Sequence, residues 1–409
     1  MEEQHSNRHF WKGALAGALA MFLVTVGALG WMQFRGVNFT ERLFGAGVQA
    51  DAGTEQKLQT LKNLIDEEYL YSDEVEEDTL REGIYTGYIN ALGDPYSVYY
   101  DEEETQSLME STSGEYSGIG VVMSQNLETG ITTAAQVYEN SPAKEAGMEA
   151  GDIIYQVDGE DVTTLDISEI AQRVRGTEGT TVEITVLRGE ENEEVSFTIE
   201  RRQVEVTTVE SEMLENQTGY IRITEFDEVT YDQFTAAFEN LEAEGMQGLI
   251  VDLRDNPGGN LLTVSQILDR LLPEGVIVYT EDKNGEREYL TSDEENKYEN
   301  PVAVLVNGNS ASASEIFAGA IQDYELGPIV GTTTYGKGVV QRIIDLGDGT
   351  CVKLTVSEYF TPNGRSINGE GITPDVEAEL QENEENPEAD SQLDTALSEL
   401  EKRYQQNAQ

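Results

Sequence analysis

A serine-rich loop is the first feature of the sequence that could do chemistry. Ser310, Ser312 and Ser314 lie in "GNSASASE", directly after the apolar run "VAVLVN" (302–307). This strand-to-helix pattern would place a serine at a helix amino-terminus, where free N–H groups favour developing negative charge. Ser312 and Glu315 also fit the S-x-x-E capping box, so an ordinary helix cap is the alternative. Spacing alone does not choose among the three serines.

A lysine in an apolar run is the second candidate. Lys337 lies between two glycines in "YGKGVVQRIID" (335–345), which alternates like a strand. Positions 337, 339 and 341 of such a strand would share one face, so Lys337 and Gln341 would point the same way. Burial lowers the pKa of a lysine, and a neutral amine can take a proton from a serine hydroxyl. A surface lysine near a strand end is the ordinary alternative.

The positions of the histidines restrict this chemistry. His5 and His9 are the two histidines of the 409-residue chain, and both precede a long apolar segment. A histidine general base, a His-paired cysteine and a His-ligated zinc are therefore excluded beyond residue 9. Acid–base catalysis would have to use a carboxylate, a lysine or a tyrosine. We predict no metal and no cofactor.

A glycine turn is the third candidate feature. The segment "DLRDNPGGN" (252–260) follows an apolar strand-like run. Its Pro-Gly-Gly turn would expose backbone N–H groups that no side chain covers, which suits an oxyanion hole. A plain tight turn is the alternative, but the three features occur together at strand ends of one domain.

The elements that must position these residues follow from the hydrophobic pattern. Strand-like and helix-like segments alternate from 217 to 383, which predicts an α/β core around a largely parallel sheet. Active sites of such sheets collect at the carboxyl ends of the strands. Residues 54–110 read as helical, 114–205 as a small β-rich module, and 384–409 as an acidic and then helical tail.

An uncharged apolar segment, 13–34, is long enough to cross a bilayer once. Trp11 and Trp31 flank it, as expected of interfacial aromatic residues. A cleaved signal peptide is the alternative, but the segment exceeds the usual apolar length of such peptides. We therefore predict a short tail (1–12), a membrane anchor and a linker (35–53).

Charge and cysteine content exclude other classes. The net charge of −54 repels phosphate backbones, so we predict no nucleic-acid partner. The single cysteine, Cys351, cannot form an internal disulfide.

Four segments resemble the signature blocks of the carboxyl-terminal processing peptidases, also called tail-specific proteases. These blocks are "VDLRDNPGG", "GNSASASEIFAGAIQDY", "GTTTYGKGVVQ" and "TPNGRSINGEGITPDV", and "ALGDPYS" resembles the family's amino-terminal helical segment. The resemblance covers residues from about 55 to 380. It implies a crotonase-like α/β core and serine endopeptidase activity.

The resemblance assigns roles to individual residues. It makes Ser312, the middle serine, the nucleophile, Lys337 the general base and Gln341 the residue that supports the lysine. It places the oxyanion hole on the backbone of Ala313 and of a glycine in the Pro-Gly-Gly turn, for which we favour Gly259, with the preceding glycine open as the alternative. Asn368 is a small departure from the family pattern, and it leaves the catalytic assignment unchanged.

The β-rich module resembles a PDZ domain through "NSPAKEAGMEAGDIIYQVDGEDV" (140–162). The segment "YSGIGVVM" (116–123) lies where PDZ domains bind a terminal carboxylate. Its backbone N–H groups would hold that carboxylate while the peptide adds a strand. We also expect Arg175 to contact the catalytic domain and to couple ligand binding to Lys337. The predicted substrate-binding residues are Gly118, Ile119, Gly120 and Val121.

The sequence thus predicts a membrane-anchored serine endopeptidase with a PDZ domain (114–205) and a protease core (206–383). Its substrates would be proteins or peptides with accessible apolar carboxyl termini. From the resemblance we expect the tail in the cytoplasm and the other domains outside it, and we leave a homodimer open. A catalytically silent PDZ protein on the membrane is the rival, but such a protein would be expected to lack the serine or the lysine.

Overall fold

The structure is a computed structural model that describes residues 52–407, apart from 190, 294–296 and 382–388. The chain divides into two compact units, the first ending at Arg81 and the second beginning at Glu82. The predicted anchor (13–34) lies outside the described residues. Among the helices that are described, none is both long and apolar enough to cross a membrane.

The first unit is helical where it is described. Helix α3 (Ala52–Glu68) is followed by the short 3-10 helix η1 (Ser72–Glu74) and the beginning of α4 (Glu77–Asn90). Lys62 on α3 donates a hydrogen bond of 2.6 Å to Glu77 on α4. Both side chains are exposed, so this ion pair contributes little stability.

The second unit begins with the end of α4, strand β1 (Val98–Tyr100) and helix α5 (Glu102–Ser113). Asp101 and Glu104 form a capping box that starts α5, and Gly114 in the left-handed conformation ends it. Strand β1 lies inside the segment that the sequence pattern reads as helical. It is only three residues long and pairs with a strand near residue 352, so no local periodicity reveals it.

A six-stranded sheet forms the centre of the second unit, in the order β10-β11-β12-β15-β16-β19. The pairs from β11 to β19 are parallel, and β10 is antiparallel to β11. The predicted α/β class with a largely parallel sheet is confirmed. The strands are β10 (Val209–Met213), β11 (Thr218–Ile223, after the 3-10 helix η2, Glu215–Gln217), β12 (Gly248–Asp252), β15 (Val302–Val306), β16 (Ile329–Gly331) and β19 (Val376–Glu377).

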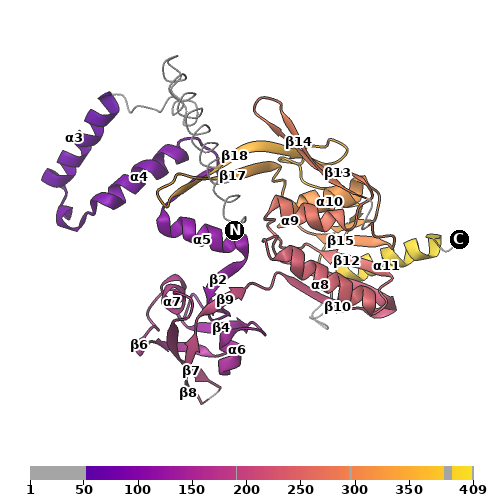
Figure 1. Ribbon diagram of the computed structural model, residues 1–409, viewed down its shortest axis with the longest axis horizontal. Helices are drawn as coiled ribbons and strands as arrows, with labels where there is room; N and C mark the ends of the chain where they lie inside the picture. Colours follow the sequence, from indigo (N-terminus) through magenta and orange to yellow (C-terminus); the bar gives the residue numbers. More distant parts are fainter. Residues whose placement is uncertain (1–51, 190, 294–296, 382–388, 408–409) are drawn as a thin grey trace, which may run out of the picture. The chain divides into compact units, whose positions relative to one another are not determined.

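Both faces of this sheet are covered, which explains the continuous apolar runs in its central strands. Leu249 and Val251 of β12 pack in the larger apolar cluster, while Ile250 faces a smaller cluster with Ala396 and Leu400. Residues of α8, α9 and α10 fill the larger cluster, and α11 supplies the smaller one (Figure 1). These helices are α8 (Thr230–Ala243), α9 (Leu261–Asp269), α10 (Ala313–Asp323) and α11 (Ser391–Asn407).

A second, antiparallel sheet carries the other catalytic candidates. Its order is β1-β18-β13-β14, and β17 also pairs with β18. Strand β17 begins at Val339, two residues after Lys337, and a β-bulge lies between Val340 and Gln341. The extra residue of this bulge, Val356, is on β18, and Lys337 precedes β17, so strand alternation does not decide whether Lys337 and Gln341 share a face. The remaining strands are β13 (Gly275–Asp282), β14 (Arg287–Ser292), β17 (Val339–Asp345) and β18 (Cys351–Phe360).

The β-rich module has its own apolar core, which includes Ile119, Ile154 and Ile184. Strand β2 pairs with β9, and a six-stranded sheet contains β3 to β8. The helices are α6 (Pro142–Ala146) and α7 (Ile167–Val174). The strands are β2 (Glu115–Gly118), β3 (Val121–Gln125), β4 (Thr132–Val137), β5 (Ile153–Val157), β6 (Glu160–Asp161), β7 (Thr181–Arg188), β8 (Glu193–Glu200) and β9 (Arg202–Glu205).

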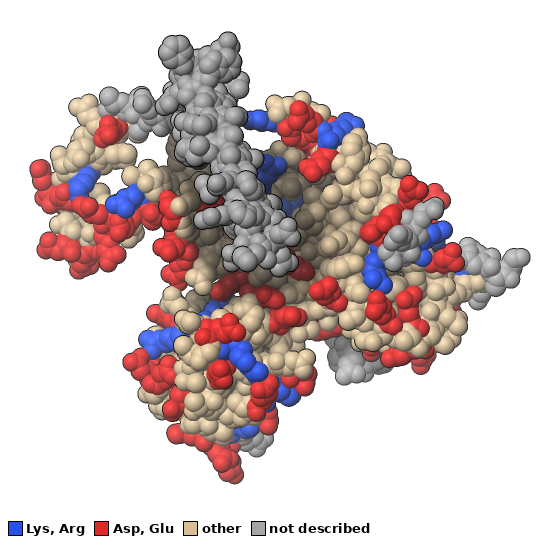
Figure 2. All heavy atoms as spheres, in the orientation of Figure 1, with Lys and Arg blue, Asp and Glu red and all other residues tan. Residues whose placement is uncertain are grey.

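Acidic side chains are more widespread than lysines and arginines on the visible surface (Figure 2). The sequence contains 79 acidic residues and 25 lysines and arginines, so few carboxylates can have a basic partner.

Candidate active site

The candidate nucleophile and the glycine turn come together because their strands are neighbours. Strands β12 and β15 are parallel partners, so the loops that follow them leave the same edge of the sheet. The first loop is the oxyanion turn (253–260), and the second, the nucleophile loop (307–312), leads into α10.

Burial distinguishes the three serines that spacing leaves equivalent. Ser310 and Ser314 are fully buried. Ser310 Oγ donates to Leu253 O at 2.7 Å, and Ser314 Oγ donates to Asn256 O at 3.0 Å. Both hydroxyls therefore hold the oxyanion turn. Ser312 is only half-buried, which leaves it accessible to a substrate.

Ser312 itself adopts a backbone conformation that is rare for a residue with a side chain. Its φ is 53° and its ψ is −111°. Such conformations cost free energy, and they persist where the surroundings hold them, often at functional sites. Two hydrogen bonds hold this conformation: the Ser312 N–H donates to Glu315, and the Tyr359 hydroxyl donates to the Ser312 carbonyl.

The two glycines of the oxyanion turn have different roles: Gly258 allows the two loops to approach closely, and Gly259 provides a free backbone N–H. A Cβ on Gly258 would lie 2.7 Å from Ala311 O and 2.8 Å from Ser312 Cβ, so only glycine fits there. The N–H of Gly258 donates to Asn256 Oδ1 at 2.8 Å. Within the described residues, the N–H groups of Gly259 and Ala313 have no acceptor. Two donors, one in the oxyanion turn and one at the start of α10, are thus free beside Ser312.

One buried carboxylate connects the two halves of the candidate site. Glu315 is fully buried in the first turn of α10. Its Oε2 accepts hydrogen bonds from the N–H groups of both Ser312 and Lys337, each at 2.8 Å. Its Oε1 accepts from Gly336 N–H at 2.7 Å and Thr334 Oγ1 at 2.6 Å. The capping interaction between Glu315 and Ser312 therefore also holds the lysine segment.

Tyr359 of β18 supports the same junction from the other side. Its hydroxyl donates to the carbonyl of Ser312, at 3.1 Å, and to the carbonyl of Lys337. Tyr359 is almost completely buried, and burial raises its pKa well above the ordinary value. The phenol therefore stays protonated and can act as the donor.

Lys337 has the surroundings expected of a lysine that loses its proton easily. Burial lowers its pKa, the charge of Lys353 lowers it further, and Glu315 partly opposes both effects. Among the described residues, Lys337 has no ion-pair partner. Its Nζ lies 4.9 Å from the ring centre of Tyr96, in the "GDPYS" turn.

The structure does not connect every predicted catalytic residue by a direct bond. Among the described residues, no hydrogen bond joins the Ser312 hydroxyl to Lys337 Nζ. Gln341 Nε2 donates to Val339 O at 3.4 Å and Thr355 Oγ1 at 3.2 Å, and not to Lys337. Catalytic hydrogen bonds are often long without substrate, so this geometry does not argue against the pair.

The predicted carboxylate loop connects β2 to β3. Gly120 has a φ of 80°, and a Cβ there would lie 2.2 Å from Ser141 Cβ, so the turn requires glycine. The carbonyl of Ile119 accepts from Ala143 N–H at 2.9 Å, which ties the loop to α6. This arrangement leaves a rigid turn at the end of a groove between β3 and α7.

The groove opens into a cavity of about 430 Å³ that also involves α5 and the 225–227 segment. Arg175 forms an ion pair of 3.0 Å with Glu110 of α5 and lies over the ring of Tyr116, 5.4 Å from its centre. Within the described residues, Arg175 does not bond to the Lys337 segment. Glu225 and Asp227 line the same cavity, and burial together with Glu225 raises the pKa of Asp227 to about 7.

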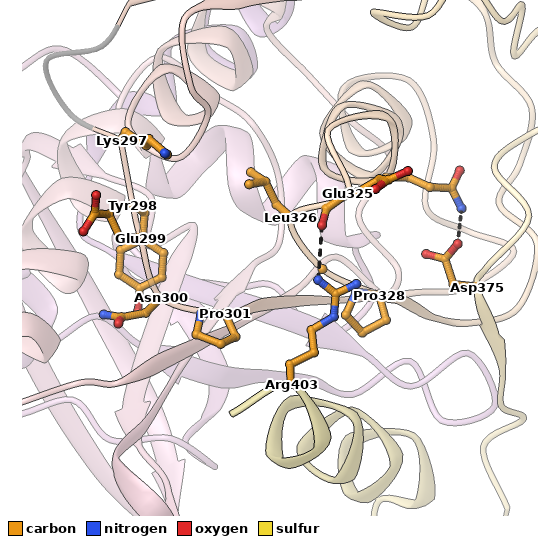
Figure 3. A pocket seen from close by; sticks show the side chains of 12 residues that line it. Lys297, Tyr298, Glu299, Asn300, Pro301, Glu325, Leu326, Pro328, Asp375 and Arg403 are labelled. Carbon is orange, nitrogen blue, oxygen red and sulfur yellow. Dashed lines mark hydrogen bonds between the residues drawn. The ribbon is translucent and has the colours of Figure 1, made fainter. Parts of the chain in front are cut away.

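A larger cavity, of about 890 Å³, contains none of the predicted site residues (Figure 3). It lies beside the end of α10 and includes Tyr298, Pro328 and Arg403, which donates to Glu325 O at 3.1 Å. Among the described residues, no group of three His, Cys, Asp or Glu side chains is arranged to hold a metal ion.

Sequence reasoning missed several residues that organise the site. Tyr359 and Lys353 lie on β18, the next strand along the chain and the partner of β17, and nothing in their local sequence marks them as parts of the site. Asn256 was also missed, although its side chain donates to Ile223 O at 2.8 Å and accepts from Gly258 N–H. Glu315 was noticed only as a helix cap.

Models of known families match three parts of the chain. Peptidase family S41 matches residues 217–378, and a PDZ domain matches 133–188. The N-terminal domain of the activating protease CtpB matches 31–105.

Three curated proteins are similar over most of this chain. The carboxy-terminal processing protease CtpA of Bacillus subtilis (strain 168) is 37% identical over 76% of this chain and 66% of its own length. CtpB of the same organism is 33% identical over 81% of this chain and 70% of its own length. The carboxyl-terminal-processing protease of Synechocystis sp. is 36% identical over 72% of this chain and 71% of its own length.

Proposed function

The chain belongs to peptidase family S41, among its serine-type carboxy-terminal processing proteases, and we propose that it is an endopeptidase that cuts protein substrates near their carboxyl ends. The main support is the bond pattern of Glu315, which holds the backbones of Ser312 and Lys337 on one oxygen. A helix cap alone would not need the second of these bonds.

In the proposed mechanism, Ser312 is the nucleophile and Lys337 is the general base. The neutral amine takes the hydroxyl proton while Oγ attacks the peptide carbonyl. The oxyanion accepts hydrogen bonds from the free N–H groups of Gly259 and Ala313. Lys337 then gives its proton to the leaving amine, and water hydrolyses the acyl-enzyme. Gln341, by resemblance, supports Lys337 once substrate is bound.

The PDZ domain supplies the proposed specificity. The backbone around Gly118, Ile119, Gly120 and Val121 would hold the terminal carboxylate of a substrate, and the peptide would pair with β3. Apolar side chains line this groove, so we propose apolar carboxyl termini as ligands.

We also propose that residues 13–34 anchor the protein in the cell membrane, with the PDZ and protease domains on the extracytoplasmic side. The length of this uncharged segment supports the anchor. Membrane fractionation of the full chain, with and without residues 13–34, tests it. A crotonase-like core and a homodimer stay predictions that rest on the resemblance.

Casein cleavage by the full chain in detergent tests the nucleophile. We expect Ser312→Ala to lose activity by about 10³-fold or more, as expected when a nucleophile is removed. Ser398→Ala, at an exposed position of α11, is the matched control and should leave cleavage unchanged. Equal cleavage by Ser312→Ala and the unmodified chain would reject the assignment of the nucleophile. If neither preparation cleaves casein, the catalytically silent PDZ protein is favoured instead.

The base has its own test. Lys337→Arg keeps the positive charge and most of the length, but guanidinium does not lose its proton in proteins. We expect this variant to be inactive in the same assay while its thermal unfolding midpoint stays close to that of the unmodified chain. Activity that survives the substitution would mean that another group takes the serine proton.

A further inference from the structure

We infer that Asp255 is a positioning residue that fixes the distance between the two halves of the oxyanion hole. It directly precedes the Asn-Pro-Gly-Gly segment of the oxyanion turn. Its φ is 61°, in the left-handed region that side chains rarely adopt. Aspartate tolerates this region better than most residues, but the conformation still needs support from its surroundings.

The nucleophile loop provides that support. Asp255 N–H donates to Asn307 Oδ1 at 3.0 Å. Asp255 Oδ1 accepts from Asn307 Nδ2 at 2.9 Å and from Asn309 Nδ2 at 2.8 Å. Asn309 N–H also donates to Asn307 Oδ1 at 3.0 Å, which closes the network. Donation by the amides of Asn309 and Asn307 lowers the pKa of Asp255, so the acceptor stays ionised near neutral pH.

The hydrogen bonds of Asp255 join the two loops at a different place from the buried hydrogen bonds. Asn256, Ser310 and Ser314 join the two loops on their buried side. Asp255 joins them on the exposed side. Links on both sides prevent one loop from rotating about the other.

The free N–H of Gly259 belongs to the oxyanion turn, and that of Ala313 to the first residue of α10, directly after the nucleophile loop. Their separation therefore depends on how the two loops are joined. An oxyanion hole requires both donors at hydrogen-bond distance from one oxygen before the charge develops. A shift of about 1 Å in such a group can cost about 10²-fold in rate. This inference rests on the proposed function, because only a peptide-cleaving site needs this separation.

Three substitutions of Asp255 in the full chain separate the network from the backbone strain. Asp255→Gly adopts the left-handed conformation freely but has no acceptor, and we expect kcat to fall about tenfold with KM changed less than twofold. Asp255→Asn keeps an oxygen at Oδ1, and we expect kcat within about threefold of the unmodified value. Asp255→Ala lacks the acceptor and keeps the strain, so its kcat should be no higher than that of Asp255→Gly.

Asp158 provides a matched control far along the chain. It also has a left-handed backbone, with φ of 51°, and its Oδ1 accepts from Glu183 N–H at 2.9 Å. Asp158→Gly should leave kcat unchanged. Because Asp255 and Asn309 are exposed, we expect all variants to fold, and the thermal unfolding midpoint checks this.

A double-mutant cycle completes the test. Asn309→Ala should lower kcat less than Asp255→Gly, and the double variant should be no worse than Asp255→Gly alone. Unchanged kcat in a folded Asp255→Gly variant would overturn the inference, as would a loss that Asp255→Asn does not rescue. If Ser312→Ala is inactive while Asp255→Gly is fully active, this inference fails and the proposed function stands. If Ser312→Ala is active, the proposed function itself fails.

Discussion

We propose that two glycine-containing loops of this molecule, the oxyanion turn and the loop between β2 and β3 (the PDZ loop), offer backbone N–H groups to an oxygen anion, and they are built differently. Within the described residues, the N–H groups of Gly259 in the oxyanion turn and of Ala313 at the start of α10 have no acceptor, and buried side chains hold the two segments together. At the PDZ loop, the molecule's own Tyr116 lies beside the donors. Its hydroxyl is near the N–H groups of Gly120 and Val121, and its ring covers the position that a Cβ on Gly118 would occupy.

This difference matches what each loop must do. A catalytic donor works best when it is fixed before the charge appears, because reorganisation during the reaction adds to the barrier. A binding loop can be covered by a weak internal group that a ligand displaces. Burial and, after it, Tyr138 raise the pKa of Tyr116 to about 12, so the group that covers the loop is a neutral phenol at neutral pH. We therefore expect substitutions to reduce function at the first loop and to improve binding at the second.

Among the substitutions that test this comparison, the largest effect is expected at Glu315. Glu315→Gln keeps the size of the side chain but places an amide NH2 where two backbone N–H groups now donate to Oε2. Buried donors without acceptors cost about 1–3 kcal/mol each. We expect kcat to fall by at least about 10²-fold and the thermal unfolding midpoint to drop. Steady-state kinetics and thermal unfolding measure the two effects.

Glu288→Gln, on an exposed position of β14, is the matched control and should change neither quantity. A Glu315→Gln variant with normal kcat would show that the carboxylate is only a helix cap. The oxyanion turn would then not depend on a fixed arrangement, and it would differ less from the PDZ loop than we infer.

The second largest effect is expected at Gly258. A Cβ there would lie 2.7 Å from Ala311 O and 2.9 Å from Ala313 N, at a φ of 107°. Gly258→Ala should therefore separate the two donor loops and lower kcat by about 10²-fold. Gly285→Ala has a similar backbone requirement, with φ of 79°, but its Cβ would meet nothing within 4 Å. If both variants keep full activity, close approach of the loops is unnecessary.

Much of this site was predictable from local sequence, because its parts lie at the ends of strongly apolar strands. The α/β alternation, the serine loop and the Pro-Gly-Gly turn are all local patterns. The choice of Ser312 was not, because the partners of Ser310 and Ser314 lie 57 and 58 residues away in sequence. From the residues alone, three serines in alternation look alike.

The position of Lys337 shows a second limit. Alternation of apolar residues predicts a strand through Lys337, but β17 starts at Val339 and a bulge follows. What holds Lys337 is Glu315, 22 residues earlier, together with Tyr359, 22 residues later. Such long-range polar contacts have no periodic signature, so only the folded chain reveals them.

A moderate effect is expected at Tyr116. Tyr116→Phe keeps the ring but removes the hydroxyl beside the N–H groups of Gly120 and Val121. We expect a peptide with an apolar carboxyl terminus to bind about three- to tenfold more tightly to this variant. In the unmodified chain the peptide carboxylate must replace the Tyr116 hydroxyl as the acceptor for these N–H groups, whereas in Tyr116→Phe no acceptor has to be displaced. Fluorescence anisotropy with a labelled peptide measures the change.

Two controls show whether this gain comes from the carboxylate loop. The same peptide with an amidated terminus should gain nothing from Tyr116→Phe. Tyr138→Phe removes another hydroxyl from the same cavity and should leave affinity within about twofold. Weaker binding to Tyr116→Phe would mean that the phenol helps to hold the ligand, and the two loops would then be more alike than we infer.

The smallest effect is expected at Lys353, which influences Lys337 through its charge alone. Its Nζ lies over the ring of Tyr100, 5.3 Å from the centre, and its charge lowers the pKa of Lys337. Lys353→Met removes this repulsion, so the protonated form of Lys337 becomes more stable and its pKa rises. Since only the neutral amine can act as a base, the rising limb of kcat/KM should move to higher pH. Lys353→Arg keeps the charge and should leave the limb in place. If the limb does not move in Lys353→Met, the charge of Lys353 does not control the protonation of Lys337. Burial would then be the main cause of the lowered Lys337 pKa.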